Sequence, residues 1–445
     1  MNKLWMAPIL LLMICPRTVT ADPIDIGSRL ELFVDDYLID TLTGAELQLQ
    51  SPTPREVAII HDEPWEGNSS GYHTVFQDGD LYRMYYRGHQ YTVKEDSFGG
   101  AHREVVCYAE SRDGVHWEKP DLGLVDYEDS KSNNIIWDAT GSHNFTPFID
   151  ANPDCKPDEK YKALGGVGNG LFIFSSADGI NWNLMDRKPV ITEGAFDSQN
   201  VAFWDETRNH YAAYFRTFTQ MGDRKVRSIA MTTSPDFIHW ATPTALEYPG
   251  SPIEQLYTNQ VIPYHRAPHL LLGFPTRYVD RPLTDHVKTI DPVELRALLL
   301  KSYRRCGTDL TDGLFMTSRD GQTFHRWGEA FIRPGLQEKG NWTYGDIYQN
   351  YGIVETKWDP GCSLEALEEL NVPSELSIYV SEGSWRTGET RERRYTLRID
   401  GFVSVHAPLP VGELVTKPIV FSGNRLQINY SSSAAGSVRV ELQDP

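Results

Sequence analysis

The heptapeptide that decides the fold is Ser111-Arg112-Asp113-Gly114-Val115-His116-Trp117. It recurs as Ser176-Ala177-Asp178-Gly179-Ile180-Asn181-Trp182, Ser234-Pro235-Asp236-Phe237-Ile238-His239-Trp240 and Ser318-Arg319-Asp320-Gly321-Gln322-Thr323-Phe324. An Asp-Gly pair is a strong signal for a tight hairpin turn, and the Ser and Asp side chains can bond the turn backbone. We expect the closing aromatic residue to fill the space between neighbouring sheets. Four such copies form a structural repeat.

A second repeat precedes these turns and consists of a strand, a polar turn and an aromatic strand that returns. The clearest copy runs from Tyr72–Phe76 through Asp78-Gly79-Asp80 to Leu81–Arg87. Four further copies begin near Asn144, Asn200, Asn259 and Asn350. Five successive units of four short strands are the pattern of a β-propeller.

The sequence therefore predicts an all-β fold, a five-bladed β-propeller with a small C-terminal β appendage. The propeller is expected over residues 22–407 and the appendage over residues 408–445, with Leu30–Ile39 completing a blade. Short helices are expected at Asp291–Leu300 and Leu364–Leu370.

Residues 1–21 have the pattern of a cleavable signal peptide. Lys3 precedes an apolar stretch, and small residues lead up to Ala21. We expect cleavage near Ala21 and export to the periplasm or the cell exterior. No later apolar run reaches about 18 residues, so no membrane span is predicted.

Composition excludes one class of partner. The chain has 445 residues, with 61 Asp and Glu against 42 Lys and Arg, for a net charge of −19. A protein that binds nucleic acid through phosphates needs a basic face, so no nucleic-acid partner is predicted. With 40% hydrophobic and 11% aromatic residues, the chain has the composition of a folded protein, and we expect a monomer.

The cysteines give little guidance. Without Cys15 of the signal peptide, four remain: Cys107, Cys155, Cys306 and Cys362. An exported chain can pair them, but buried thiols and one or two bridges are equally compatible with so few. None has the spacing of a zinc site, and the sequence predicts no metal and no cofactor.

Two sets of polar side chains are expected at one mouth of the propeller channel, because inner strands begin there and second strands return there. The inner-strand starts carry His73, Asn144, Asn200, Asn259 and Asn350. The ends of the second strands carry Arg87, Arg216, Arg277 and Glu382. Short polar residues at strand starts can equally cap exposed backbone. Three matched arginines suit a bidentate grip on a carboxylate, a sulfate or a hydroxyl-rich ligand, although a single arginine at a strand end is usually a solvated charge.

Carboxylates near these starts indicate a possible chemistry. Asp197, Glu254 and Asp346 each lie close to an inner-strand start. Glycoside hydrolysis needs one carboxylic acid to protonate the leaving oxygen and a second carboxylate to attack or to activate water. His73 is an alternative acid or base, since it titrates near neutral pH. Tyr257 is placed to stack on a sugar face.

The hairpins resemble those of a known enzyme class. The copies that carry the resemblance are Asp78-Gly79-Asp80-Leu81-Tyr82-Arg83-Met84-Tyr85-Tyr86 and Val201-Ala202-Phe203-Trp204-Asp205. Over roughly Leu30–Val405 the chain resembles the five-bladed propeller superfamily of arabinanases, xylosidases and fructan- or sucrose-cleaving glycosidases. The Ser-x-Asp-Gly-x-x-Trp turns also resemble those of sialidases, a six-bladed fold. The resemblance implies a propeller that acts on a glycan.

The sequence departs from that superfamily where catalysis occurs. Those enzymes carry an Asp at the first inner-strand start, a second Asp two blades on and a Glu in the next blade. The matching places here are Tyr72-His73, Gln199-Asn200 and Thr258-Asn259, and none is a carboxylate. Asp197 and Glu254 are therefore near neighbours of the catalytic places and not their equivalents.

Two functions from different classes remain. The first is an exported glycoside hydrolase whose substrate is an oligo- or polysaccharide; the arginines suit an acidic or sulfated glycan. The alternative is a non-catalytic carbohydrate-binding propeller without the catalytic carboxylates. A propeller used only for protein contacts fits less well with a polar channel mouth.

Overall fold

The computed structural model describes residues 22–443 apart from 96, 303–306, 337–341, 343–346, 358–360, 386–389 and 410. The predicted signal peptide, Cys306 and Asp346 lie outside the described residues. The chain forms two compact units. The larger comprises Leu47–Ser404, and the smaller joins the described residues before 47 to those after 404.

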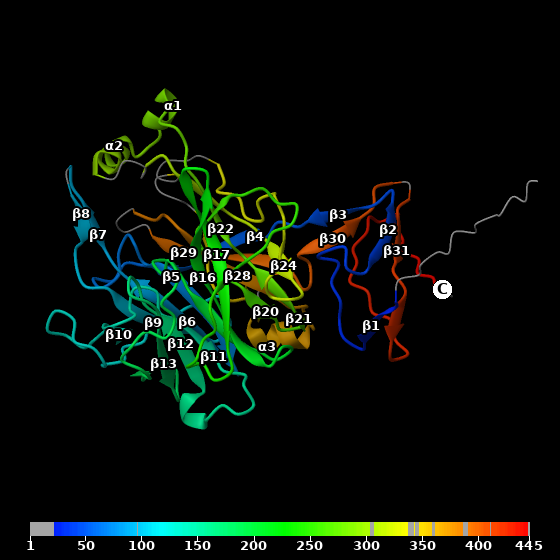
Figure 1. Cartoon of the computed structure of the whole chain (residues 1–445), viewed down its shortest axis with the longest axis horizontal. Coiled ribbons are helices and arrows are strands. Elements are labelled where there is room, and N and C mark those ends of the chain that lie inside the picture. The colour runs from blue at the N-terminus through cyan, green and yellow to red at the C-terminus, as the bar shows by residue number, and fades with distance from the viewer. Residues whose placement is uncertain are drawn as a thin grey trace, which may run out of the picture. The chain divides into compact units, whose positions relative to one another are not determined.

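The larger unit is built mostly of strands, and the described part contains five sheets of four or five strands that follow one another along the chain (Figure 1). The first sheet contains β5 (Gly71–Asp78), β6 (Leu81–Gly88), β9 (Val105–Ser111) and β10 (Ile135–Trp137). The second contains β11 (Thr146–Ile149), β12 (Tyr161–Gly165), β13 (Phe172–Ser176) and β14 (Asn183–Leu184). The third contains β15 (Val201–Asp205), β16 (His210–Met221), β17 (Arg224–Ser234) and β18 (Thr244–Ala245).

The fourth and fifth sheets complete this succession. The fourth contains β20 (Ile262–Tyr264), β21 (Ala267–Gly273), β24 (Met316–Ser318) and β25 (His325–Arg326). The fifth contains β26 (Tyr348–Gln349), β27 (Val354–Thr356), β28 (Glu375–Glu382), β29 (Arg391–Arg398) and β4 (Thr53–Ile60). Within each sheet, neighbouring strands pair antiparallel, and β26 and β27 both pair with β28.

Smaller elements decorate these sheets. A three-stranded sheet contains β19 (Gln255–Leu256), β22 (Thr276–Val279) and β23 (Leu310–Gly313), and a hairpin contains β7 (Tyr91–Val93) and β8 (Phe98–Gly100). The helices are α1 (Asp285–Lys288), α2 (Val293–Ser302), α3 (Leu364–Glu369) and a 3₁₀ turn at Pro157–Glu159. The two helices expected from the sequence are confirmed by α2 and α3. In the described part of the chain, no helix has the length and apolarity needed to cross a membrane.

The smaller unit joins the two ends of the described chain. β1 (Ile24–Gly27) pairs in parallel with β32 (Ile419–Phe421), and β2 (Ile39–Thr43) pairs antiparallel with β31 (Glu413–Thr416). The strands β3 (Glu46–Leu49) and β30 (Val403–His406) lie at the boundaries of the units. The C-terminal segment predicted to form its own module therefore pairs with residues near the N-terminus.

The prediction that Leu30–Ile39 completes a blade is wrong. β4 occupies that place, pairing antiparallel with β29 of the fifth sheet. Both segments are apolar and precede the first hairpin, so the sequence alone did not distinguish them.

The Asp-Gly turns form as predicted. In every copy the Asp Oδ1 accepts hydrogen bonds from the backbone N–H groups two and three residues further on. The residue after the Asp is left-handed, with φ of 71° at Gly114 and 68° at Phe237. A phenylalanine is strained there, and its fully buried ring offsets this strain by packing against Phe148 and Trp240.

Tyrosine hydroxyls connect these turns to neighbouring sheets. Tyr85 of the first sheet donates to the carbonyl of Gly179, in the turn between β13 and β14 of the second (3.0 Å), and Tyr214 of the third donates to that of Gly321, between β24 and β25 of the fourth (2.8 Å). Tyr379 of the fifth sheet donates to the carbonyl of Gly114, which lies between β9 and β10 of the first sheet. The fifth sheet therefore contacts the first.

The cysteines that the structure describes, Cys107, Cys155 and Cys362, are free thiols. Cys107 is fully buried among the strands of the first sheet. None of these three cysteines forms a disulfide bond, and Cys306 lies outside the described residues.

The first prediction concerns the turn at Asp178. Burial opposes the charged form, but hydrogen bonds from Asn181 and Ile180 outweigh it and lower the pKa of Asp178 to about 2. Asp178→Ala removes these bonds and is expected to lower the free energy of unfolding by about 1–3 kcal/mol. In the parent this contribution is present above a pH of about 4 and is lost as the pH falls through about 2.

Urea unfolding at several pH values measures this effect. Exposed Asp223→Ala is the matched control. The assignment fails if both variants unfold alike, or if the difference between Asp178→Ala and the parent does not shrink in acid.

The second prediction concerns the contact between the fifth and first sheets. Tyr379→Phe keeps the ring but deprives the Gly114 carbonyl of its donor, so we expect a loss of about 0.5–1.5 kcal/mol in the free energy of unfolding. Tyr430→Phe, at a tyrosine that is 56% exposed, serves as the control in thermal unfolding. Equal melting temperatures for the two variants would contradict the role given to Tyr379.

Candidate active site

The larger unit contains a cavity of about 860 Å³. Its lining carries five basic side chains, Arg87, Arg216, Arg224, Lys225 and Arg227. Three carboxylates, Asp197, Glu254 and Asp280, share the same wall. The cavity thus has a cationic excess although the whole chain has a net charge of −19.

Aromatic rings alternate with these charges. Tyr72, Tyr91, Phe218, Tyr257, Tyr348 and Trp385 also line the cavity. The Arg216 guanidinium lies 5.5 Å from the Tyr257 ring centre, and that of Arg87 lies 4.7 Å from the Tyr72 ring centre. Stacking on a ring orients each guanidinium, and both groups also have polar partners, Asp197 for Arg216 and Ser69 for Arg87.

Asp197 reaches the cavity on a loop that two buried asparagines hold. The side-chain amides of Asn144 and Asn200 both donate to the carbonyls of Phe196 and Ser198, on either side of Asp197. The Asp197 side chain is 59% exposed and forms an ion pair with Arg216. Asn144 and Asn200 therefore cap backbone and position the Asp197 loop, without lining the cavity themselves.

Glu254 is held by two arginines. Its carboxylate pairs with Arg277 (2.9 Å) and with Arg326. Burial opposes ionisation, but the hydrogen bonds from Arg326 and Arg277 outweigh it and lower the pKa of Glu254. Arg277 also pairs with Asp312 at 2.6 Å, and it therefore holds Glu254 from behind. Arg277 itself is not among the residues that line the cavity.

A histidine that sequence reasoning missed also lines the cavity. The imidazole Nδ1 of His143 lies 2.8 Å from Glu104 Oε1, and the Arg87 guanidinium lies 3.7 Å from the same oxygen. Burial lowers the pKa of His143, and Glu104 only partly opposes this. A neutral imidazole oriented by a carboxylate can act as a general base. The signal in the sequence was the place of His143, directly before the strand start at Asn144.

The other predicted residues are divided between the cavity and the interior. Arg87, Arg216, Tyr257 and Asn350 line the cavity together with Asp197 and Glu254. Asn259 is buried and donates to the carbonyls of Gln199 and Tyr214. Glu382 pairs with Arg391 and Arg393 instead of facing the cavity. Asp346 lies outside the described residues.

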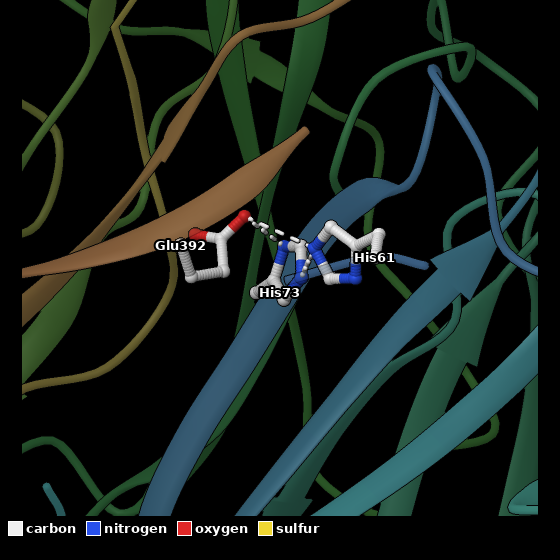
Figure 2. Close-up of side chains that lie close together, drawn as sticks. All are labelled: His61, His73 and Glu392. Atoms are coloured by element: carbon white, nitrogen blue, oxygen red, sulfur yellow. Dashed lines mark hydrogen bonds and ion pairs between the residues drawn. The ribbon is translucent and has the colours of Figure 1, made fainter. Parts of the chain in front are cut away.

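His73 does not reach the cavity. It is fully buried between the first and fifth sheets, where it contacts His61 and Glu392 (Figure 2). Burial and the nearby charges of His61 and Arg87 lower its pKa. Within the described residues, these three side chains are the group whose donor atoms are close enough to hold a metal ion, all within 4.8 Å of one another.

No protein-family model matches the chain. An uncharacterized protein of Mycobacterium tuberculosis strain H37Rv is 39% identical over 165 residues, which cover 36% of this chain and 48% of that protein. A second uncharacterized protein, from strain CDC 1551, is 39% identical over 167 residues with the same coverage. The chain thus spans about half the length of the curated relatives it matches.

Solved structures are similar over most of the chain at low identity. One described as a glycoside hydrolase has a TM-score of 0.47 and 14% identity, covering 82% of this chain and 96% of its own. An N-acetylgalactosamine deacetylase from F. plautii has a TM-score of 0.44 at 14% identity, with 82% and 96% covered. An endo-arabinase from Bacteroides thetaiotaomicron has a TM-score of 0.41 at 10% identity, with 77% and 98% covered. The function is therefore inferred from the cavity itself.

Proposed function

We propose that the protein is an exported glycoside hydrolase that binds an anionic glycan in this cavity. The observation that carries the proposal is the lining, where stacked arginines and aromatic rings surround the carboxylates of Asp197 and Glu254. Aromatic faces suit the apolar faces of sugar rings, and guanidinium groups suit uronic or sulfate groups. A volume of about 860 Å³ is in the range of small-ligand sites, with room for a short saccharide.

The proposed architecture is a five-bladed β-propeller formed by the five sheets, with the smaller unit as its appendage. The tyrosine bonds between successive sheets and between the fifth sheet and the first support this interpretation. Residues from the first, third and fifth sheets meet at the cavity, as expected of strands that converge on a channel.

The proposed chemistry assigns different roles to the two carboxylates. Glu254, whose pKa is lowered by two arginines, stays ionised and suits the role of base or nucleophile. Asp197 is paired with Arg216, a cation that an anionic substrate would also attract. When the anionic group of the substrate pairs with Arg216, the Asp197 carboxyl loses the positive charge that favours its ionised form. Asp197 can then hold the proton that the leaving oxygen needs.

One observation favours a second candidate, a carbohydrate-binding protein without catalysis. Asp197 and Glu254 are each paired with arginine, which favours the charged form of each and leaves neither as a ready acid. Binding would then use the same arginines and rings, without bond cleavage. Turnover separates the two functions.

The third prediction concerns anion recognition by Arg216. Arg216→Ala is expected to weaken binding of a uronic or sulfated oligosaccharide by about 1.5–3 kcal/mol, the range for hydrogen bonds to charged groups. A neutral oligosaccharide of the same length should lose less affinity. Calorimetric titration of both ligands measures the difference, and exposed Arg187→Ala is the control for removal of one positive charge. Equal losses for both ligands would mean that Arg216 is scaffolding.

The fourth prediction separates hydrolysis from binding. A screen for reducing-sugar release on neutral, uronic and sulfated polysaccharides identifies the substrate. Asp197→Asn and Glu254→Gln should each abolish turnover of that substrate and leave its binding within about threefold of the parent, since both changes preserve shape. Exposed Asp223→Asn is the matched control.

Three outcomes would each contradict a part of the proposal. Full turnover by both variants would reject the assignment of these carboxylates. Glycan binding without release by the parent would favour the binding protein. Absence of both binding and release across the panel would reject a glycan as the ligand.

A further inference from the structure

Three fully buried side chains meet where the first and fifth sheets adjoin. His61 follows β4, Glu392 lies on β29 of the same sheet, and His73 lies on β5 of the first sheet. Figure 2 shows the three side chains turned toward one another. Because Glu392 follows the two histidines by more than 300 positions, this cluster exists only in the folded chain.

The distances suit shared ligation of one ion. The two imidazole Nε2 atoms lie 3.1 Å apart, and Glu392 Oε1 lies 3.6 Å from His61 Nε2 and 3.2 Å from His73 Nδ1. Around a tetrahedral ion with bonds of about 2.0–2.2 Å, neighbouring donor atoms are separated by roughly 3.3–3.6 Å. The observed spacings bracket that range, so an ion needs only small side-chain adjustments.

Three buried polar atoms of the cluster form no hydrogen bond of good geometry. These are His61 Nδ1, His73 Nδ1 and Glu392 Oε1; the last two lie 3.2 Å apart, and His61 Nδ1 lies 3.7 Å from Glu66, without a hydrogen bond forming at either place. A buried polar atom without a partner costs about 1–3 kcal/mol, and a charged one costs more. Among the described residues, no lysine or arginine lies within ion-pair distance of Glu392. A cation at this point would compensate the carboxylate.

Surrounding residues orient these ligands as the outer shell of a metal site does. Asn350 donates to Glu392 Oε2, which leaves Oε1 for the ion. Glu66 lies 3.7 Å from His61 Nδ1, on the side of the ring opposite to Nε2. Tyr86 (2.5 Å) and Lys119 (2.7 Å) in turn hold Glu66. A carboxylate behind a histidine is a common device for fixing the ring of a metal ligand.

We propose that His61, His73 and Glu392 bind one divalent transition-metal ion, with Zn²⁺ the best match. Two histidines and one glutamate form a known zinc donor set, and borderline nitrogen and oxygen donors disfavour Ca²⁺ and Mg²⁺. The bound ion cross-links the first and fifth sheets beside the place where β4 pairs with β29. It therefore stabilises the contact between the two ends of the succession of sheets.

The site also adjoins the cavity. Asn350 lines the cavity and bonds Glu392, and Ser381, another lining residue, donates to Asn350 Oδ1 at 3.3 Å. Metal binding therefore fixes this part of the cavity wall through two hydrogen bonds. This role is independent of whether the cavity hydrolyses a glycan.

The test measures metal in the full-length protein. Protein stripped with a chelator, incubated with Zn²⁺ and dialysed into metal-free buffer should retain one ion per chain by elemental analysis. The chelator should lower the melting temperature, and Zn²⁺ should restore it, because an ion that binds only the folded state stabilises it. Co²⁺ in place of Zn²⁺ should give visible absorption of a tetrahedral or five-coordinate site.

Variants locate the ion. His61→Ala, His73→Ala and Glu392→Gln should lose stoichiometric Zn²⁺, whereas exposed His239→Ala should retain it. Because a ligand variant can fail to fold, Glu66→Gln provides a milder change that should weaken Zn²⁺ affinity about 10- to 100-fold. The proposal is overturned if the parent retains no ion and its melting temperature changes with neither chelator nor Zn²⁺. It is also overturned if Glu66→Gln and the folded ligand variants bind as tightly as the parent.

Discussion

The pairing of β4 with β29 is the contact on which the larger unit depends. β4 precedes the first sheet in sequence but forms a strand of the fifth, so sheets at opposite ends of the chain are joined. Beside this pairing, Val75 N–H donates to the carbonyl of Tyr351 (2.8 Å), and Tyr351 N–H donates to the carbonyl of His73 (3.0 Å). Backbone bonds of this kind satisfy inner-strand edges that would otherwise be left unpaired.

The floor of the cavity follows from the same convergence of inner strands. Gln199 donates to the carbonyl of His73 (3.0 Å), and Gln260 donates to the Gln199 side chain (2.7 Å) and to the carbonyl of Gln349 (2.9 Å). These glutamines supply donors to backbone groups of different sheets at a point where no further strand can enter. Gln199, Gln260 and Gln349 also line the cavity, so part of its lining is polar because backbone groups of different sheets must be satisfied there.

Placement of the arginines explains how an acidic protein can attract an anionic ligand. Most surface charge is negative, whereas Arg87, Arg216 and Arg227 converge on one concavity where rings limit their contact with water. A cationic cavity focuses its positive potential on an approaching anion. The negative charge on the rest of the surface repels polyanions. The long hairpin of β16 and β17 contributes much of this charge by extending past its sheet to bring Arg224, Lys225 and Arg227 to the cavity.

The sequence by itself determined the local turns. The Ser-x-Asp pattern, followed by Gly in three copies and by Phe237 in the other, encodes its hydrogen bonds within seven residues, so the four turns and the hairpins beside them were predictable. Asp197, Glu254, Arg87, Arg216, Tyr257 and Asn350 were also placed at one site, because the strand register brings matched positions to the same edge.

Only the tertiary structure decided the contacts between distant segments. In the folded chain β4, and not Leu30–Ile39, is a strand of the fifth sheet. The side chains of Asn144, Asn200 and Asn259 donate to backbone carbonyls. The tertiary structure also turned His73 away from the cavity toward His61 and Glu392. The physical reason is that register places a residue at a strand end, whereas the face on which its side chain lies, and the partner it meets there, depend on how neighbouring sheets pack.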